Sequence, residues 1–210
     1  MSHMSIKNIL SLLLIACCAV CSMAQSDAGK YIDSVMAHAK KASGITAQFT
    51  MKGDERSGHY QQGTLMMKGE KFRLSTNDIT TWYDGKTIWT YAASIGEVNI
   101  TTPTRHELME INPYLILDNY SNSFIVNELP SQIKGERVFR LTPTKRNTPF
   151  TSITVTIATA QQAPISFEIN INNNITQVAV TQYNDKAQLP ASTFTFDAAS
   201  YPNVTVIDLR

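Results

Sequence analysis

Residues 79–91, ITTWYDGKTIWTY, are the stretch that decides the fold class. Two runs of β-branched and aromatic residues flank the dipeptide Asp84-Gly85. Asp and Gly tolerate the positive φ angles that a tight turn of type I′ requires, and such a dipeptide between two apolar runs is a strong hairpin signal. The stretch therefore predicts a β-hairpin.

Short runs of the same kind continue on both sides of this hairpin, separated by turn residues. Ile, Val and Thr make up 53 of the 210 residues, and such side chains favour strands. A second tight turn is expected at Asn172-Asn173-Asn174, because Asn adopts left-handed backbone readily. We predict strands at residues 47–51, 63–68, 72–76, 79–83, 87–91, 97–101, 124–128, 137–142, 151–159, 165–171, 175–183 and 193–196.

Two segments have helical periodicity instead. Residues 27–41 carry an apolar stripe that includes Tyr31, Val35 and Met36, and residues 104–119 carry a second stripe that Asn112-Pro113 interrupts. About a dozen strands exceed what a flat sheet holds comfortably, so the sheet should curl. We predict a mainly β fold with helices (α+β): an incomplete antiparallel β-barrel of eleven to twelve strands, with a helical lid over its apolar concave face.

The amino-terminal residues have the pattern of an export signal. Lys7 precedes an apolar run of residues 9–20, and Ser22 and Ala24 are small residues at the positions that a signal peptidase reads. We expect residues 1–24 to be a signal peptide, with a cloning remnant at residues 1–4, and residues 25–210 to form one domain. The alternative is a membrane-anchored lipoprotein acylated at Cys17.

The cysteine and charge counts restrict the chemistry of the mature chain. All three cysteines lie in the signal segment, so no disulfide or thiolate remains after cleavage. A net charge of +1 gives no sign of nucleic-acid binding. His38, His59 and His106 belong to no metal-binding or catalytic motif. We therefore expect a non-enzymatic protein without a metal or cofactor.

Large apolar side chains alternate along several of the predicted strands and should share the concave face. An ordinary packed core and a cavity for an apolar ligand are both compatible with this composition. The cavity hypothesis names ten lining residues: Phe49, Leu65, Met67, Phe72, Leu74, Trp89 and Tyr91 from strands, and Leu108, Ile111 and Leu115 from the lid.

Several of these runs together resemble the LolA family of periplasmic outer-membrane lipoprotein carriers. The resemblance rests on residues 63–68, Phe72-Arg73, residues 83–91, residues 112–116, residues 139–143, residues 194–196 and residues 204–206. It implies a monomeric carrier in the periplasm of a Gram-negative bacterium. Such a carrier shields lipoprotein acyl chains, or another lipid, between an inner-membrane ATP-driven extractor and an outer-membrane receptor.

One position departs from the pattern of that family. Many members carry Lys-Arg-Pro at the end of the second strand, where the arginine bonds to the closed lid, whereas this chain has Lys68-Gly69-Glu70. The resemblance therefore leaves open whether the chain is the main carrier or a relative that handles another lipid. A sensor or protein-interaction module on the same fold, with a filled core, is the hypothesis from a different functional class.

Overall fold

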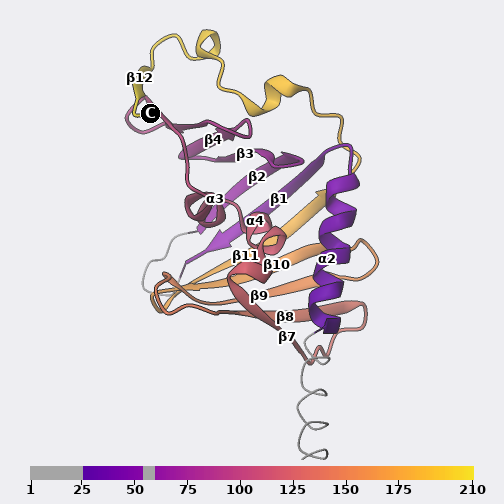
Figure 1. Ribbon diagram of the computed structural model, residues 1–210. Helices are drawn as coiled ribbons and strands as arrows, with labels where there is room; N and C mark the ends of the chain where they lie inside the picture. Colours follow the sequence, from indigo (N-terminus) through magenta and orange to yellow (C-terminus); the bar gives the residue numbers. More distant parts are fainter. Residues whose placement is uncertain (1–25, 54–59) are drawn as a thin grey trace, which may run out of the picture.

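The computed structural model describes residues 26–53 and 60–210, and it places them around one strongly curved sheet of twelve strands (Figure 1). The order of the strands is β12-β6-β5-β4-β3-β2-β1-β11-β10-β9-β8-β7. Neighbouring strands are antiparallel except β12, which runs parallel to β6. Because β7 and β12 do not pair with each other, the barrel is incomplete, as predicted.

The strands follow the predicted runs closely, with one exception at the carboxyl end. They are β1 (Ile45–Lys52), β2 (Tyr60–Lys68), β3 (Lys71–Thr76), β4 (Ile79–Tyr83), β5 (Ile88–Ala92), β6 (Glu97–Thr101), β7 (Phe124–Leu129), β8 (Glu136–Pro143), β9 (Phe150–Ala158), β10 (Ala163–Ile171), β11 (Asn174–Asn184) and β12 (Thr205–Asp208).

The two predicted turns both connect antiparallel strands. At the β4–β5 connection the Asp84 carboxylate accepts hydrogen bonds from the Lys86 and Thr87 N–H groups, each at 2.8 Å. Only one residue of this turn, Gly85, has a positive φ (101°), so the hairpin forms without the type I′ geometry. Asn172 and Asn173 have φ values of 50° and 65° between β10 and β11, and this pair does fit that geometry.

The helices lie on one face of the sheet, which we call the inner face. They are α2 (Ser26–Lys41), α3 (Arg105–Ile111) and α4 (Pro113–Asp118), and a short 3₁₀ helix, η1 (Tyr120–Asn122), follows them. Val35 of α2, Leu108 of α3 and Leu115 of α4 belong to the same buried core as the inner-face side chains of the strands. The prediction that both helical segments cover the open side of a single curved sheet is confirmed.

Local chemistry at Asn112 explains why the lid is broken into two helices. Asn112 ends α3 in extended backbone conformation, and its side-chain oxygen accepts a hydrogen bond from the Tyr114 N–H at 3.1 Å. Pro113 then occupies the first turn of α4, where its missing N–H leaves no helical hydrogen bond unmade. A capping box between Thr104 and Glu107 begins α3, so each lid helix has its own start signal.

The predicted strand at residues 193–196 is wrong. This stretch instead contains the 3₁₀ helix η2 (Ala191–Phe194), and the short 3₁₀ helix η3 (Ala198–Ser200) follows before β12. Phe194 is only 1% exposed, and the Phe196 ring lies 5.6 Å from that of Trp82 on the outer face of the sheet. Burial of these two rings against the outer face outweighs the strand propensity of the run.

Some predictions concern residues that the structure does not describe. The signal segment and its cysteines, including Cys17, lie outside the described residues. Among residues 26–53 and 60–210, no helix has both the length and the apolar character needed to cross a membrane. The same residues contain no cluster of three or more His, Cys, Asp or Glu side chains suited to a metal ion.

Candidate functional site

An apolar cavity of about 230 Å³ lies between the inner face of the sheet and the lid helices. Its wall combines strands from both halves of the sheet with the break between α3 and α4. The lining residues are Ala47, Phe49, Met51, Leu65, Leu74, Thr76, Met109, Glu110, Ile111, Asn112, Pro113, Tyr114, Ile116, Phe150, Phe167, Ile169, Ile171, Thr176, Val178 and Val180.

The sheet register brings the first wall of the cavity together. Phe49 of β1 pairs with Gly63 of β2, and Leu65 of β2 pairs with Leu74 of β3, so these residues share one face. A Cβ atom at Gly63 would collide with the Phe49 ring and would lie 2.7 Å from the Ser75 carbonyl oxygen. Glycine at this position therefore lets the Phe49 ring lie over β2 and helps to shape the cavity wall.

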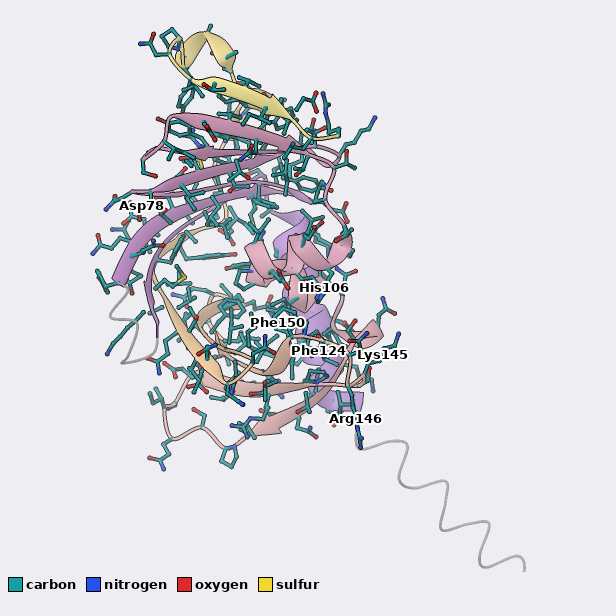
Figure 2. All side chains as sticks on the ribbon, turned by 90° about the vertical axis from the view of Figure 1, so that its left-hand side faces the viewer. Asp78, His106, Phe124, Lys145, Arg146 and Phe150 are labelled. Atoms are coloured by element: carbon teal, nitrogen blue, oxygen red, sulfur yellow. The ribbon has the colours of Figure 1, made fainter. Side chains whose placement is uncertain are left out.

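A second, smaller cavity of about 130 Å³ adjoins the first beneath α3. Both cavities are lined by Met109 and Phe150. The Phe150 ring lies 5.9 Å from the Phe124 ring and 5.9 Å from the His106 ring, with edge-to-face geometry in both contacts. Figure 2 shows these three side chains around the interior of the curve, with Lys145 toward the edge. The apolar interior thus has a polar margin on this side, formed by His106 and Lys145.

A third cavity of about 270 Å³ lies on the other side of α4, toward α2. Met36 and Leu115 contribute to its apolar part, and Lys40, Glu70 and Asp118 are charged residues in its wall. Tyr114 lines both this cavity and the first one. Helix α4 therefore forms the partition between two apolar spaces, each of which is smaller than typical ligand pockets of about 300–1,000 Å³.

An ion-pair network holds the lid to the rest of the molecule. The Arg105 guanidinium of α3 lies 3.3 Å from the Glu70 carboxylate in the β2–β3 turn and 3.7 Å from the Asp118 carboxylate of α4. Asp118 also pairs with Lys40 near the end of α2. We call these four residues the lid network. These pairs connect both lid helices to α2 and to the β2–β3 turn of the sheet. Lys40, Glu70 and Asp118 also line the third cavity.

The cavities also contain polar groups that are almost completely buried. Tyr114 is 2% exposed and Asn112 is 1% exposed. Burial raises the pKa of the Tyr114 hydroxyl above its ordinary value, with a smaller contribution from Tyr183, whose own pKa is raised to about 12 mainly by burial. Both phenols are therefore protonated hydrogen-bond donors at neutral pH.

Four of the ten residues predicted for the cavity line it: Phe49, Leu65, Leu74 and Ile111. Two others, Met67 and Leu115, line the third cavity. Phe72 and Leu108 are buried in the core that surrounds these spaces. The structure therefore brings eight of the ten residues to the inner face or to the lid.

The remaining two residues, Trp89 and Tyr91, lie on the outer face of β5. Leu74 pairs with Thr81, and Thr81 pairs with Thr90, so Thr90 and not its neighbours points inward. The Tyr91 ring packs 5.0 Å from that of Tyr201 in the carboxyl-terminal segment. This segment covers the outer face, so β5 carries large side chains on both faces and its sequence does not reveal which face is inward.

The sequence prediction also omitted one wall of the cavity. Phe167 and Ile169 of β10, and Val178 and Val180 of β11, come from the second half of the chain. Alternation of apolar residues along these two strands was a usable signal. The sequence alone does not place these residues at the cavity, because the pairing of β1 with β11, which brings this wall beside Phe49, joins segments far apart in the chain.

Comparison with known proteins identifies the family. The family model for the outer membrane lipoprotein carrier protein LolA matches residues 19–136, more than half of the chain. The chain belongs to the LolA family. No curated protein matches its sequence.

Solved structures agree with this family at the level of the fold. An uncharacterized conserved protein from Thermus thermophilus has 10% identity and a TM-score of 0.57, with 84% of this chain and 98% of that chain covered. A putative outer membrane lipoprotein-sorting protein domain from Vibrio parahaemolyticus has 11% identity and a TM-score of 0.50, with 81% and 97% covered. These similarities confirm the LolA-like fold.

The lid network is where this chain departs from the LolA pattern quoted above. The turn after the second strand carries Gly69 where that pattern has an arginine. The next residue, Glu70, contacts the lid instead, and the cation of this contact, Arg105, comes from the lid. In this chain the turn and the lid are therefore joined by an ion pair whose anion lies in the turn and whose cation lies on the lid. The second partner of Arg105, Asp118, is only 10% exposed. The Arg105–Asp118 pair is therefore less screened by solvent than the Arg105–Glu70 pair.

Proposed function

We propose that this LolA-family protein is a non-enzymatic carrier of the periplasm that holds lipoprotein acyl chains in the space between its inner face and its lid. The observation that carries the proposal is the apolar cavity of about 230 Å³ under lid helices that are fastened by ion pairs. Such a space favours a carrier over an interaction module, whose core would be filled.

The physical requirement on such a carrier is to shield hydrocarbon from water. Exposing an acyl chain costs about 0.8 kcal/mol per methylene, so a chain crosses the periplasm only when a protein covers it. The inner wall supplies aromatic and aliphatic side chains for this purpose, including Phe49, Phe150 and Phe167. Delivery from an inner-membrane ATP-driven extractor to an outer-membrane receptor is the role that family membership suggests for it.

The size of the cavities indicates how the carrier would load. The first cavity is below the usual range for ligand sites, so it holds part of a single chain while the lid is closed. Displacement of α4 would join the first and third cavities, since Tyr114 of this helix lines both. We therefore propose that longer or additional acyl chains enter by displacing the lid.

The test is native mass spectrometry of the protein purified from its own cell envelope, together with titration of a fluorescent acyl probe. Two variants each add one carboxylate at neighbouring positions of β1. Phe49→Glu places it in the cavity wall, whereas Gln48→Glu places it on the exposed outer face. A carboxylate in the apolar wall lacks a partner, so Phe49→Glu should abolish probe binding while Gln48→Glu retains it.

The control for both variants is the fold, measured by circular dichroism. Equal binding of the probe by folded Phe49→Glu and by the parent would contradict the proposed cavity. Purified protein that carries no acyl-bearing molecule and binds no acyl probe would favour a sensor or interaction module on the LolA-like fold.

A further inference from the structure

Two buried side chains that carry hydrogen-bond donors lie at the break of the lid, two residues apart in the chain. Asn112 and Tyr114 both line the cavity, and both are nearly inaccessible to solvent. The Tyr114 hydroxyl has no hydrogen-bond partner among the described residues. The Asn112 amide nitrogen donates to the Met67 sulfur at 3.3 Å, and a thioether is a weak acceptor.

A buried donor without a partner, such as the Tyr114 hydroxyl, is uncommon in folded proteins and points to a missing acceptor. More than nine-tenths of buried polar groups have a good partner, and each exception calls for an explanation. The Tyr183 hydroxyl also has no partner among the described residues, and Tyr183 of β11 pairs with Ala47, a residue of the cavity wall. Apart from Thr76, Glu110 and Thr176, the other described residues of the cavity wall have apolar side chains, so a ligand oxygen would be the natural acceptor.

The charges around the cavity favour a neutral acceptor over an anionic one. Among the described residues that line it, Glu110 is the one charged residue, and its carboxylate would repel an anion. No lysine or arginine among the described residues lines this cavity: Lys145 lines the second cavity, Lys68 lines the third, and Lys40 and Arg105 are paired with Asp118 in the lid network. A carboxylate group inside the cavity would therefore be buried without a counter-ion, which is costly, whereas an ester or amide carbonyl would not.

We propose that Asn112 and Tyr114 form a binding site for the carbonyl oxygen of an acyl ester or acyl amide whose hydrocarbon chain occupies the cavity. This inference rests on the proposed function and names the chemical group that the cavity recognises in addition to the chain. The small side-chain movements that admit the oxygen accompany displacement of the lid. Selection then depends on the acyl linkage as well as on chain length.

The test compares two ligands that differ only in the carbonyl oxygen: monododecanoylglycerol and its ether analogue, dodecylglycerol. Each displaces the apolar fluorescent reporter N-phenyl-1-naphthylamine from the whole protein. The wild type should prefer the acyl form by about fivefold, the value of one net hydrogen bond. Tyr114→Phe should bring the ratio close to one, while the outer-face control Tyr201→Phe leaves it unchanged.

A second variant and a third ligand make the test independent of a single substitution. Asn112→Ser removes the amide donor but keeps a side-chain oxygen that can cap α4, and it should also lower the ratio. Dodecanoate should bind more weakly than the acylglycerol, and tighter binding of the anion would overturn the choice of a neutral carbonyl.

Two results separate failure of this inference from failure of the proposed function. A wild-type ratio near one, or a ratio that neither Tyr114→Phe nor Asn112→Ser reduces, would overturn the carbonyl site while leaving the acyl carrier intact. Displacement by none of the three ligands would overturn the acyl carrier and the carbonyl site together.

Discussion

Removal of the Arg105 side chain tests the lid network most directly. Arg105→Ala breaks the contacts to Glu70 at 3.3 Å and to Asp118 at 3.7 Å at once. Glu70 is 58% exposed, so its pair contributes little, whereas Asp118 is 10% exposed and its pair is less screened by solvent. Lys40 still pairs with Asp118 in the variant, so no buried carboxylate is left alone. Together the two lost contacts stabilise the closed lid by about 1 kcal/mol.

A loss of about 1 kcal/mol corresponds to about a fivefold increase in the open population of a lid that is mostly closed. If an acyl probe enters only through the open lid, its uptake rate in a stopped-flow experiment should rise about fivefold. The ion pairs are partly exposed, so 1 M salt should speed the wild type toward the rate of the variant and change the variant little.

The matched control is Arg140→Ala, which removes an exposed arginine of β8 that has no ion pair among the described residues. Its uptake rate should equal that of the wild type at both salt concentrations. If Arg105→Ala takes up the probe no faster than Arg140→Ala at low salt, the network does not hold the lid. The same conclusion follows if the two variants respond to salt alike.

Three further substitutions test stability. Tyr114→Phe removes a buried hydroxyl without a partner, so the free energy of unfolding in urea should rise by about 1 kcal/mol, and a fall would show that the hydroxyl is already bonded. Gly63→Ala should lower the free energy of unfolding by about 1–3 kcal/mol because the new Cβ collides with the Phe49 ring. An unchanged midpoint of urea unfolding would refute this packing. The hydrogen bonds from Arg137 lower the pKa of Glu128 below its ordinary value of 4.5. These hydrogen bonds contribute less than about 1 kcal/mol to stability at this exposed site. The contribution is present above pH 4.5 and is lost as the pH falls through the lowered pKa of Glu128. The free energy of unfolding of Glu128→Gln should therefore depend less on pH below 4.5 than that of the wild type.

Much of the fold could be predicted because its signals are local. The Asp84-Gly85 dipeptide specifies a hairpin through side-chain hydrogen bonds that span only three residues. The break in the lid depends in the same way on Asn112 and Pro113, which are adjacent in the chain. Where one turn or one cap decides the structure, the residues that decide it stand together in the sequence.

Local sequence signals do not reveal that part of the outer face of the sheet is covered. Trp89 and Tyr91 have the character of inner-face residues but lie on the outer face. There Tyr201 of the carboxyl-terminal segment packs against the rings of Tyr91 and Trp82. The run at residues 193–196 has strand character for the same reason, because Phe194 and Phe196 are apolar residues that pack against this face. Only the tertiary structure reveals that a strand has two covered faces.

The lid network could not be predicted at all, since Glu70 and Arg105 are 35 residues apart and neither lies in a recognisable motif. The absence of the family's arginine from the second turn was visible in the sequence. The ion pair between Arg105 on the lid and Glu70 in the turn becomes evident only from the distance between α3 and the β2–β3 turn.

Under the proposed function, an acyl chain too long for the first cavity competes with the closed lid for space. Helix α4 separates two apolar cavities, so a chain that extends from one to the other must displace Tyr114 and loosen the contacts of Asp118 with Lys40 and Arg105. Opening the lid network then offsets part of the free energy gained by burying methylenes, which lowers the net affinity for the chain. A carrier requires this balance. If the free energy of burying the whole chain appeared entirely as affinity, the chain would not be released to a receptor.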